Sequence, residues 1–128
     1  MTVSITALYA GILALMLLAL GINVTVHRGK LKVPMGDGGN PQMLRMIRLH
    51  GNAVEYVPLG LGLMALFELD GGWHGALHAA GIALIVARVL QSWGMWRTAM
   101  PNFGRVSGQA LTWATIAALA VLNLWKVV

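Results

Sequence analysis

Four apolar stretches, each long enough to cross a bilayer as a helix, dominate this sequence of 128 residues. A hydrocarbon core about 30 Å thick is crossed by about 20 helical residues. The stretches cover about residues 3–26, 47–69, 75–96 and 106–127. A chain of this length holds one domain. The pattern therefore predicts an all-α fold over residues 1–128, a transmembrane four-helix bundle.

Positive charges indicate which side of the membrane each connection faces. Seven of the nine Lys and Arg residues lie in or beside two connections, residues 27–47 and 97–105. The connection between the second and third stretches instead carries Glu68 and Asp70 and has no Lys or Arg. Because short basic connections stay in the cytoplasm, we expect these two connections to be cytoplasmic. Both termini of the multi-pass chain would then lie on the far side.

The second stretch carries polar residues that contact with lipid cannot explain. Arg45, Arg48, Asn52 and Glu55 are spaced by three, four and three residues, which places them along one face of a helix. Glu55 lies about 10 Å deeper than Arg48 at 1.5 Å per residue. A charge at the helix centre costs roughly 2.5–3.5 kcal/mol. Glu55 must therefore face protein, face a water-filled cleft or be protonated.

The third stretch offers a partner for this polar face. Arg88 lies roughly 12 Å inward from Trp96, and an antiparallel neighbour places it at the depth of Glu55. Gln91 shares the helix face of Arg88. One interpretation is a buried Glu55–Arg88 ion pair with Asn52 as an interhelical contact. The other is a ligand site, because the surplus of arginines in this half of the chain favours an anion.

The segment from Arg48 to Pro58, RLHGNAVEYVP, resembles a motif of the MAPEG family, the membrane-associated proteins in eicosanoid and glutathione metabolism. In that motif, on the second helix, an Arg is followed after three residues by an Asn and after two more by a Glu. The four stretches, the chain length and the basic connections also fit the family. The run from Gly36 is most similar to its small members from the bacterial inner membrane. The resemblance implies a homotrimer in that membrane.

The resemblance also implies a ligand and a reaction. Family enzymes bind glutathione between adjacent subunits, so we expect a glutathione transferase or peroxidase that acts on lipophilic electrophiles from the bilayer. Arg105 is the expected catalytic residue, because a nearby guanidinium favours the nucleophilic thiolate, and Arg97 is its alternative. The family pattern implies that glutathione contacts Arg48, His50, Asn52, Glu55 and Tyr56, and that Arg28 contacts it from the neighbouring subunit. The polar positions of the third stretch add Arg88 and Gln91 as candidate contacts.

The charges of glutathione agree with this set of residues. Arginines suit its carboxylates, and Glu55 suits its ammonium group. However, Gln91, Trp93 and Trp96 stand where eicosanoid-forming members carry tyrosines, which argues against the eicosanoid reactions. A non-catalytic membrane protein of the same fold remains an alternative. A small transporter of cations is disfavoured, because arginines around Glu55 would repel its substrate.

Two further classes of partner are not expected. The sequence has no Lys- and Arg-rich run with interleaved aromatic residues, so we expect no nucleic-acid partner. It has no cysteine, and the pair His74 and His78, one helical turn apart, has no obvious further ligand for a metal ion beyond Asp70. We therefore expect glutathione as a co-substrate and no metal.

Overall fold

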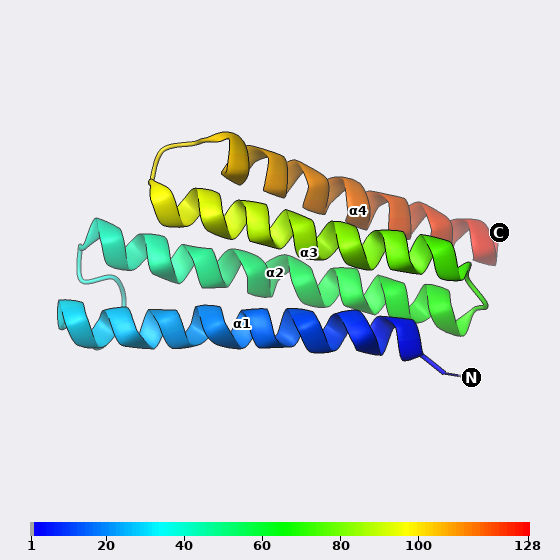
Figure 1. The fold of residues 1–128 in the computed structure, drawn as a ribbon, viewed down its shortest axis with the longest axis horizontal. Helices are drawn as coiled ribbons and strands as arrows, with labels where there is room; N and C mark the ends of the chain where they lie inside the picture. The colour runs from blue at the N-terminus through cyan, green and yellow to red at the C-terminus, as the bar shows by residue number, and fades with distance from the viewer. Residues whose placement is uncertain (1) are drawn as a thin grey trace.

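The computed structural model describes residues 2–128 and folds into four helices: α1 (Ser4–Leu31), α2 (Pro41–Leu69), α3 (His74–Arg97) and α4 (Phe103–Val127). Each helix runs antiparallel to the one before it, and the long axes lie side by side (Figure 1). No strand occurs between residues 2 and 128. The predicted all-α four-helix fold is therefore confirmed.

Three of the helices, α1, α3 and α4, are long and apolar enough to cross a membrane. The remaining helix, α2, has a similar length of 29 residues but is less apolar. The difference comes from the polar residues of its first half, among them Arg48, Asn52 and Glu55. These same residues are the ones that a lipid environment would penalise, so α2 needs protein or water beside it.

The helices extend past the apolar stretches at one end of the bundle. α1 continues to Leu31 rather than stopping near residue 26, and α2 begins at Pro41 rather than near residue 47. Capping explains the start of α2, because the Asn40 side chain accepts a hydrogen bond from Met43 N at 3.0 Å. Hydropathy therefore marks the part of each helix that crosses lipid and misses the polar turns beyond it.

The packing places α2 and α3 at the centre of the bundle. α1 and α4 each pack against both central helices, and within residues 2–128 they do not contact each other. The main apolar core fills the half of the bundle that is nearer the termini. Its largest buried side chains are Tyr9, Leu13, Val57, Met64, Phe67, Leu77, Leu84 and Leu119.

The Glu68 side chain binds the start of α1 in the half of the bundle that contains the apolar core. Its two carboxylate oxygens accept hydrogen bonds from the backbone N–H groups of Ile5 at 2.9 Å and Thr6 at 2.7 Å. The first N–H groups of a helix have no partner within the helix, so Glu68 acts as a cap from a distant part of the sequence. The contact joins the start of α1 to the last turn of α2.

In the other half, α3 and α4 approach each other closely because small residues face the contact. A Cβ added to Gly108 would lie 2.5 Å from Ala87 O and 2.6 Å from Gln91 N, both backbone atoms of α3. Glycine therefore sets the spacing of the two backbones at this point, as small residues do in membrane bundles. This close approach fixes where the first turns of α4 lie relative to Gln91.

Candidate functional site

The candidate site lies in the half of the bundle that contains the α1–α2 and α3–α4 connections, opposite the first turn of α1 and the last turn of α4 (Figure 1). We call this the basic half. Among the hollows that open here, two are both lined by Arg105. The outer hollow, about 240 Å³, is lined by Pro41, Leu44, Arg45, Arg48, Met95, Thr98, Ala99 and Arg105.

The inner hollow lies nearer the middle of the helices and is larger, at about 460 Å³. Residues of α2, α3 and α4 and of the connection before α4 form its walls. They are Asn52, Tyr56, Gln91, Pro101, Arg105, Val106, Gln109, Ala110 and Trp113. The lining therefore combines amides and a guanidinium with apolar side chains of α4.

A buried arginine organises the floor beneath the inner hollow. Arg88 is 2% exposed. Its Nη1 donates a hydrogen bond to Asn52 Oδ1 at 2.7 Å, and its Nη2 donates to Thr112 Oγ1 at 2.5 Å and to Gln91 Oε1. These bonds join α2, α3 and α4 through one guanidinium. Its charge is matched by neutral oxygen atoms and not by a carboxylate.

Of the two interpretations of this polar face, the Glu55–Arg88 ion pair is therefore wrong, whereas the contact of Asn52 with the neighbouring helix is present. Among residues 2–128 the one ion pair is Arg48–Glu55, with Nη1 and Oε1 3.0 Å apart. Arg88 does lie level with the polar face of α2, where it contacts Asn52, but three residues along a helix turn the Glu55 side chain by about 60° from that of Asn52. Asn52 faces α3 and meets Arg88, whereas Glu55 faces out of the bundle.

The Arg48–Glu55 pair lies on the open side of α2. The two side chains are 49% and 50% exposed. Exposed ion pairs contribute about 0–1 kcal/mol, so a ligand that offers its own charges can replace this contact at little cost. The pair therefore presents a cation and an anion side by side, from residues two helical turns apart, and Arg48 also lines the outer hollow.

Arg105 is held at the boundary between the hollows by the connection before α4. Its backbone N–H donates to Asn102 Oδ1 at 3.0 Å, which caps the helix, and its Nη1 donates to Ala99 O at 2.9 Å. A guanidinium carries further N–H donors beyond the one used here. Arg105 can therefore keep its position and still bind an anion in either hollow.

Three of the expected residues lie away from the hollows. Arg28 Nη1 donates to Gly36 O at 2.7 Å and supports the α1–α2 connection. The His50 ring faces α1, where a Cβ added to Gly21 would lie 3.4 Å from its Nε2. Arg97 stacks on the Trp93 ring, with its Cζ 5.0 Å from the centroid. The described chain thus gathers Arg48, Asn52, Tyr56, Gln91 and Arg105 around the hollows.

Two residues of α4 that the sequence analysis missed belong to this site. Thr112 binds Arg88, and Gln109 lines the inner hollow. With Arg105 they are spaced by four and three residues, which places all three on one face of α4. That spacing was visible in the sequence. Hydropathy alone does not mark these residues, because a single Gln and a few Thr leave a stretch of this length apolar on average.

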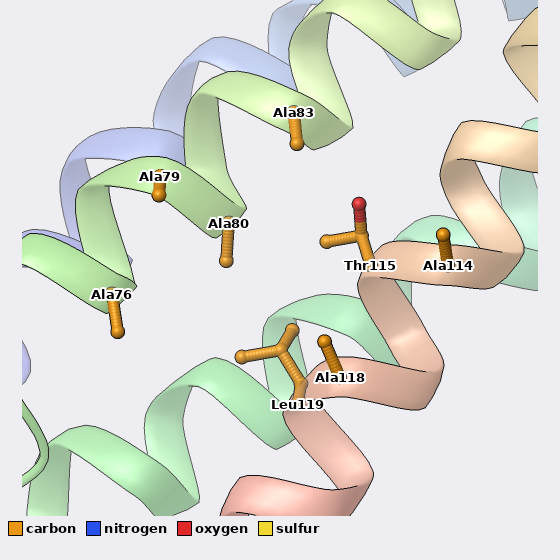
Figure 2. A pocket seen from close by; sticks show the side chains of 8 residues that line it. All are labelled: Ala76, Ala79, Ala80, Ala83, Ala114, Thr115, Ala118 and Leu119. Carbon is orange, nitrogen blue, oxygen red and sulfur yellow. The ribbon is translucent and has the colours of Figure 1, made fainter.

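A third hollow, about 330 Å³, lies between α3 and α4 and is nearly free of polar groups. Figure 2 shows small side chains of both helices pointing into it. We call it the alanine groove, and its lining is Ala76, Ala79, Ala80, Ala83, Ala114, Thr115, Ala118 and Leu119. The Thr115 hydroxyl donates to Leu111 O of its own helix at 2.8 Å. The groove therefore has an apolar surface that offers a ligand no hydrogen bond from this hydroxyl.

Comparison with known proteins adds two findings. The model of the MAPEG family matches residues 6–125. The inner membrane protein YecN of Escherichia coli strain K12 is 35% identical over 121 residues, which cover 94% of this chain and 91% of YecN. The protein of the same name from Escherichia coli O6:H1 strain CFT073 matches to the same extent.

Proposed function

The chain belongs to the MAPEG family, and from that premise we propose that it binds glutathione in the inner membrane of a bacterium. We further propose that it uses glutathione as a co-substrate against lipophilic electrophiles, as a transferase or a peroxidase. Three apolar helices and the resemblance to an inner membrane protein support the location.

The observation that carries the proposal is the pair of adjoining hollows that share Arg105. The outer hollow also holds Arg45 and Arg48, and no Asp or Glu is part of its lining among the described residues. Several cations around one space favour an anionic ligand, and guanidinium groups bind carboxylates with paired hydrogen bonds. Glutathione has carboxylates at both ends, which suits this distribution.

The exposed ion pair suits the zwitterionic end of glutathione. The γ-glutamyl α-carbon carries an ammonium and a carboxylate together. Glu55 accepts hydrogen bonds from the ammonium while Arg48 donates to the carboxylate, so the ligand replaces one weak contact with two. Because the Arg48–Glu55 pair is half exposed, opening it costs about 1 kcal/mol or less.

Arg105 is proposed to activate the thiol. A guanidinium beside a thiol lowers the pKa of that thiol, because it stabilises the thiolate. The thiolate then attacks the electrophilic carbon, a C–S bond forms, the leaving group departs with its electron pair, and the thiol proton passes to water. With a lipid hydroperoxide, two glutathione molecules are oxidised to the disulfide, and an alcohol and water are formed. Val106, Ala110 and Trp113 give the lipophile an apolar wall.

A homotrimer would complete the site. Arg48 and Glu55 are half exposed on the outer face of α2, and charged groups at such a position are costly against lipid. We propose that neighbouring subunits cover this face and that Arg28 reaches the cleft from one of them. We also propose that the basic half faces the cytoplasm, in keeping with the positive-inside rule.

A binding titration tests the ligand. We expect millimolar glutathione to raise the melting temperature of the detergent-solubilised protein, because a ligand that binds the folded state stabilises it. The shift should shrink strongly in Arg48→Ala and Glu55→Gln. Lys30→Ala, which removes an exposed cation beyond the site, should keep it. No shift for the unaltered chain at any glutathione concentration would reject the proposal and favour a non-catalytic membrane protein.

A further inference from the structure

The side chain of Gln109 differs from the other amides of the inner hollow. Its Nε2 and Oε1 are both buried, and neither has a hydrogen-bond partner among residues 2–128. The two other amide side chains of this hollow have their oxygens occupied, because Asn52 Oδ1 and Gln91 Oε1 accept hydrogen bonds from Arg88. Gln109 therefore lines the hollow while its amide holds both a donor and an acceptor that are covered from solvent and have no partner among the described residues, so that a turn of this side chain would bring them to a ligand.

A buried amide without partners is destabilising, since it loses its hydrogen bonds to water and gains none in return. A Leu or Met at this position of an apolar helix would avoid that penalty. The penalty disappears when a ligand supplies an acceptor for Nε2 and a donor for Oε1. A peptide group carries both functions, a carbonyl oxygen and an N–H.

We propose that Gln109 recognises the peptide backbone of the bound tripeptide: Nε2 donates to a peptide carbonyl, and Oε1 accepts from a peptide N–H. This inference rests on the proposed function, because glutathione is the ligand that provides these groups. The position agrees with it. Gln109 lies one helical turn from Arg105 on the same face of α4, and two peptide groups adjoin the cysteine whose thiol Arg105 would hold.

Gln109 then has a role distinct from that of Arg105. Arg105 acts on the sulfur atom, so its effect depends on a free thiol. Gln109 would bind the peptide groups of the ligand, so its contribution to the binding free energy should be the same whether the sulfur is free or blocked. S-methylglutathione, which keeps both peptide groups and lacks the thiol, separates the two residues.

The test compares Gln109→Met with Gln42→Met as a matched control, since Gln42 is exposed at the start of α2. We expect Gln109→Met to raise the dissociation constant about fivefold to tenfold for both glutathione and S-methylglutathione, as the loss of one or two hydrogen bonds implies. The ligand-free melting temperature should stay the same or rise, because an unpaired buried amide is removed. Gln42→Met should change neither quantity.

The outcomes distinguish this inference from the proposed function. If the unaltered chain binds neither ligand, the proposed function is rejected, and this inference with it. If the unaltered chain binds and Gln109→Met binds equally well, Gln109 does not contact the ligand, and only this inference is overturned. A melting temperature that falls in Gln109→Met would reveal a structural partner and would also overturn it. Should Gln109→Met fail to fold, Gln109→Leu provides the same comparison with a more compact side chain.

Discussion

The alanine groove and the inner hollow both border α4 and are of similar size, about 330 Å³ and 460 Å³. Their polar groups set them apart. In the alanine groove the single hydroxyl, on Thr115, is bonded within its own helix. The inner hollow is lined by Arg105 and Gln109 together with the amides Asn52 and Gln91. Because polar groups inside a membrane are costly, their concentration in one hollow indicates a site more clearly than the volume does.

The polar and the apolar hollow correspond to two different halves of α4. Its first half carries Arg105, Gln109 and Thr112, whereas its second half presents alanines toward α3. The first half is also the part that glycine holds close to α3. The polar site therefore lies where the backbones of α3 and α4 pack closely, and the apolar groove lies where a space remains between the two helices. Substitutions of similar size in the two halves should have different consequences.

The largest effect is expected where α3 and α4 are closest. In Gly108→Val the new side chain meets Ala87 O and Gln91 N, which are backbone atoms and cannot move aside. We expect a loss of about 3 kcal/mol in the free energy of unfolding, at the upper end for overpacking, together with loss of glutathione binding. Gly62→Val, at a position with nothing within 4 Å, is the matched control for thermal unfolding. Equal stability of the two variants would show that the close approach is not needed.

Removal of a guanidinium from the hollows comes next. We expect Arg105→Ala to lower the turnover of 1-chloro-2,4-dinitrobenzene with glutathione about 100-fold, as the loss of one charge-stabilising donor does elsewhere. The effect should lie in kcat more than in glutathione affinity. Arg97→Ala should cost much less, because Arg97 stacks on Trp93. A larger loss in Arg97→Ala would transfer the thiolate role to that residue.

A smaller effect is expected from the apolar half. Glu68→Ala removes the carboxylate that caps the N–H groups of Ile5 and Thr6. Loss of a helix cap costs about 1 kcal/mol, so thermal unfolding should occur at a lower temperature while the dissociation constant for glutathione stays unchanged. Asp70→Ala is the control, because the recorded contact of Asp70 with Lys126 uses its backbone oxygen. A change in glutathione affinity would show that the two halves are coupled.

Much of the fold was predictable because crossing lipid imposes a strong pattern. Apolar length gave the four helices, and the motif from Arg48 to Pro58 indicated the family that the comparisons confirm. The ends of α1 and α2 were missed because their last polar turns lie outside the apolar stretches. Glutathione, the homotrimer and the orientation of the loops stay predictions.

The sequence predicted how far along the helices the polar residues lie, but not which way their side chains point. The rise per residue places Arg88 level with the polar face of α2, but it does not determine how α2 is rotated about its axis. That rotation decides that Asn52 and not Glu55 meets Arg88. The partners on α4 depend on long-range packing through Gly108, and a single sequence does not reveal which neighbour such a glycine contacts.

The smallest effect is expected from filling the alanine groove, and it gives the sharpest comparison of the two hollows. Ala118→Leu adds apolar volume to an open groove without a polar partner, so stability should change by about 0.5 kcal/mol or less, and glutathione turnover should stay the same. Ala110→Leu makes the same chemical change on the apolar wall of the inner hollow. Because that wall would hold the lipophile, the KM for 1-chloro-2,4-dinitrobenzene should rise several-fold in Ala110→Leu alone. The opposite result, with Ala118→Leu as the variant that alters KM, would place the lipophile in the alanine groove.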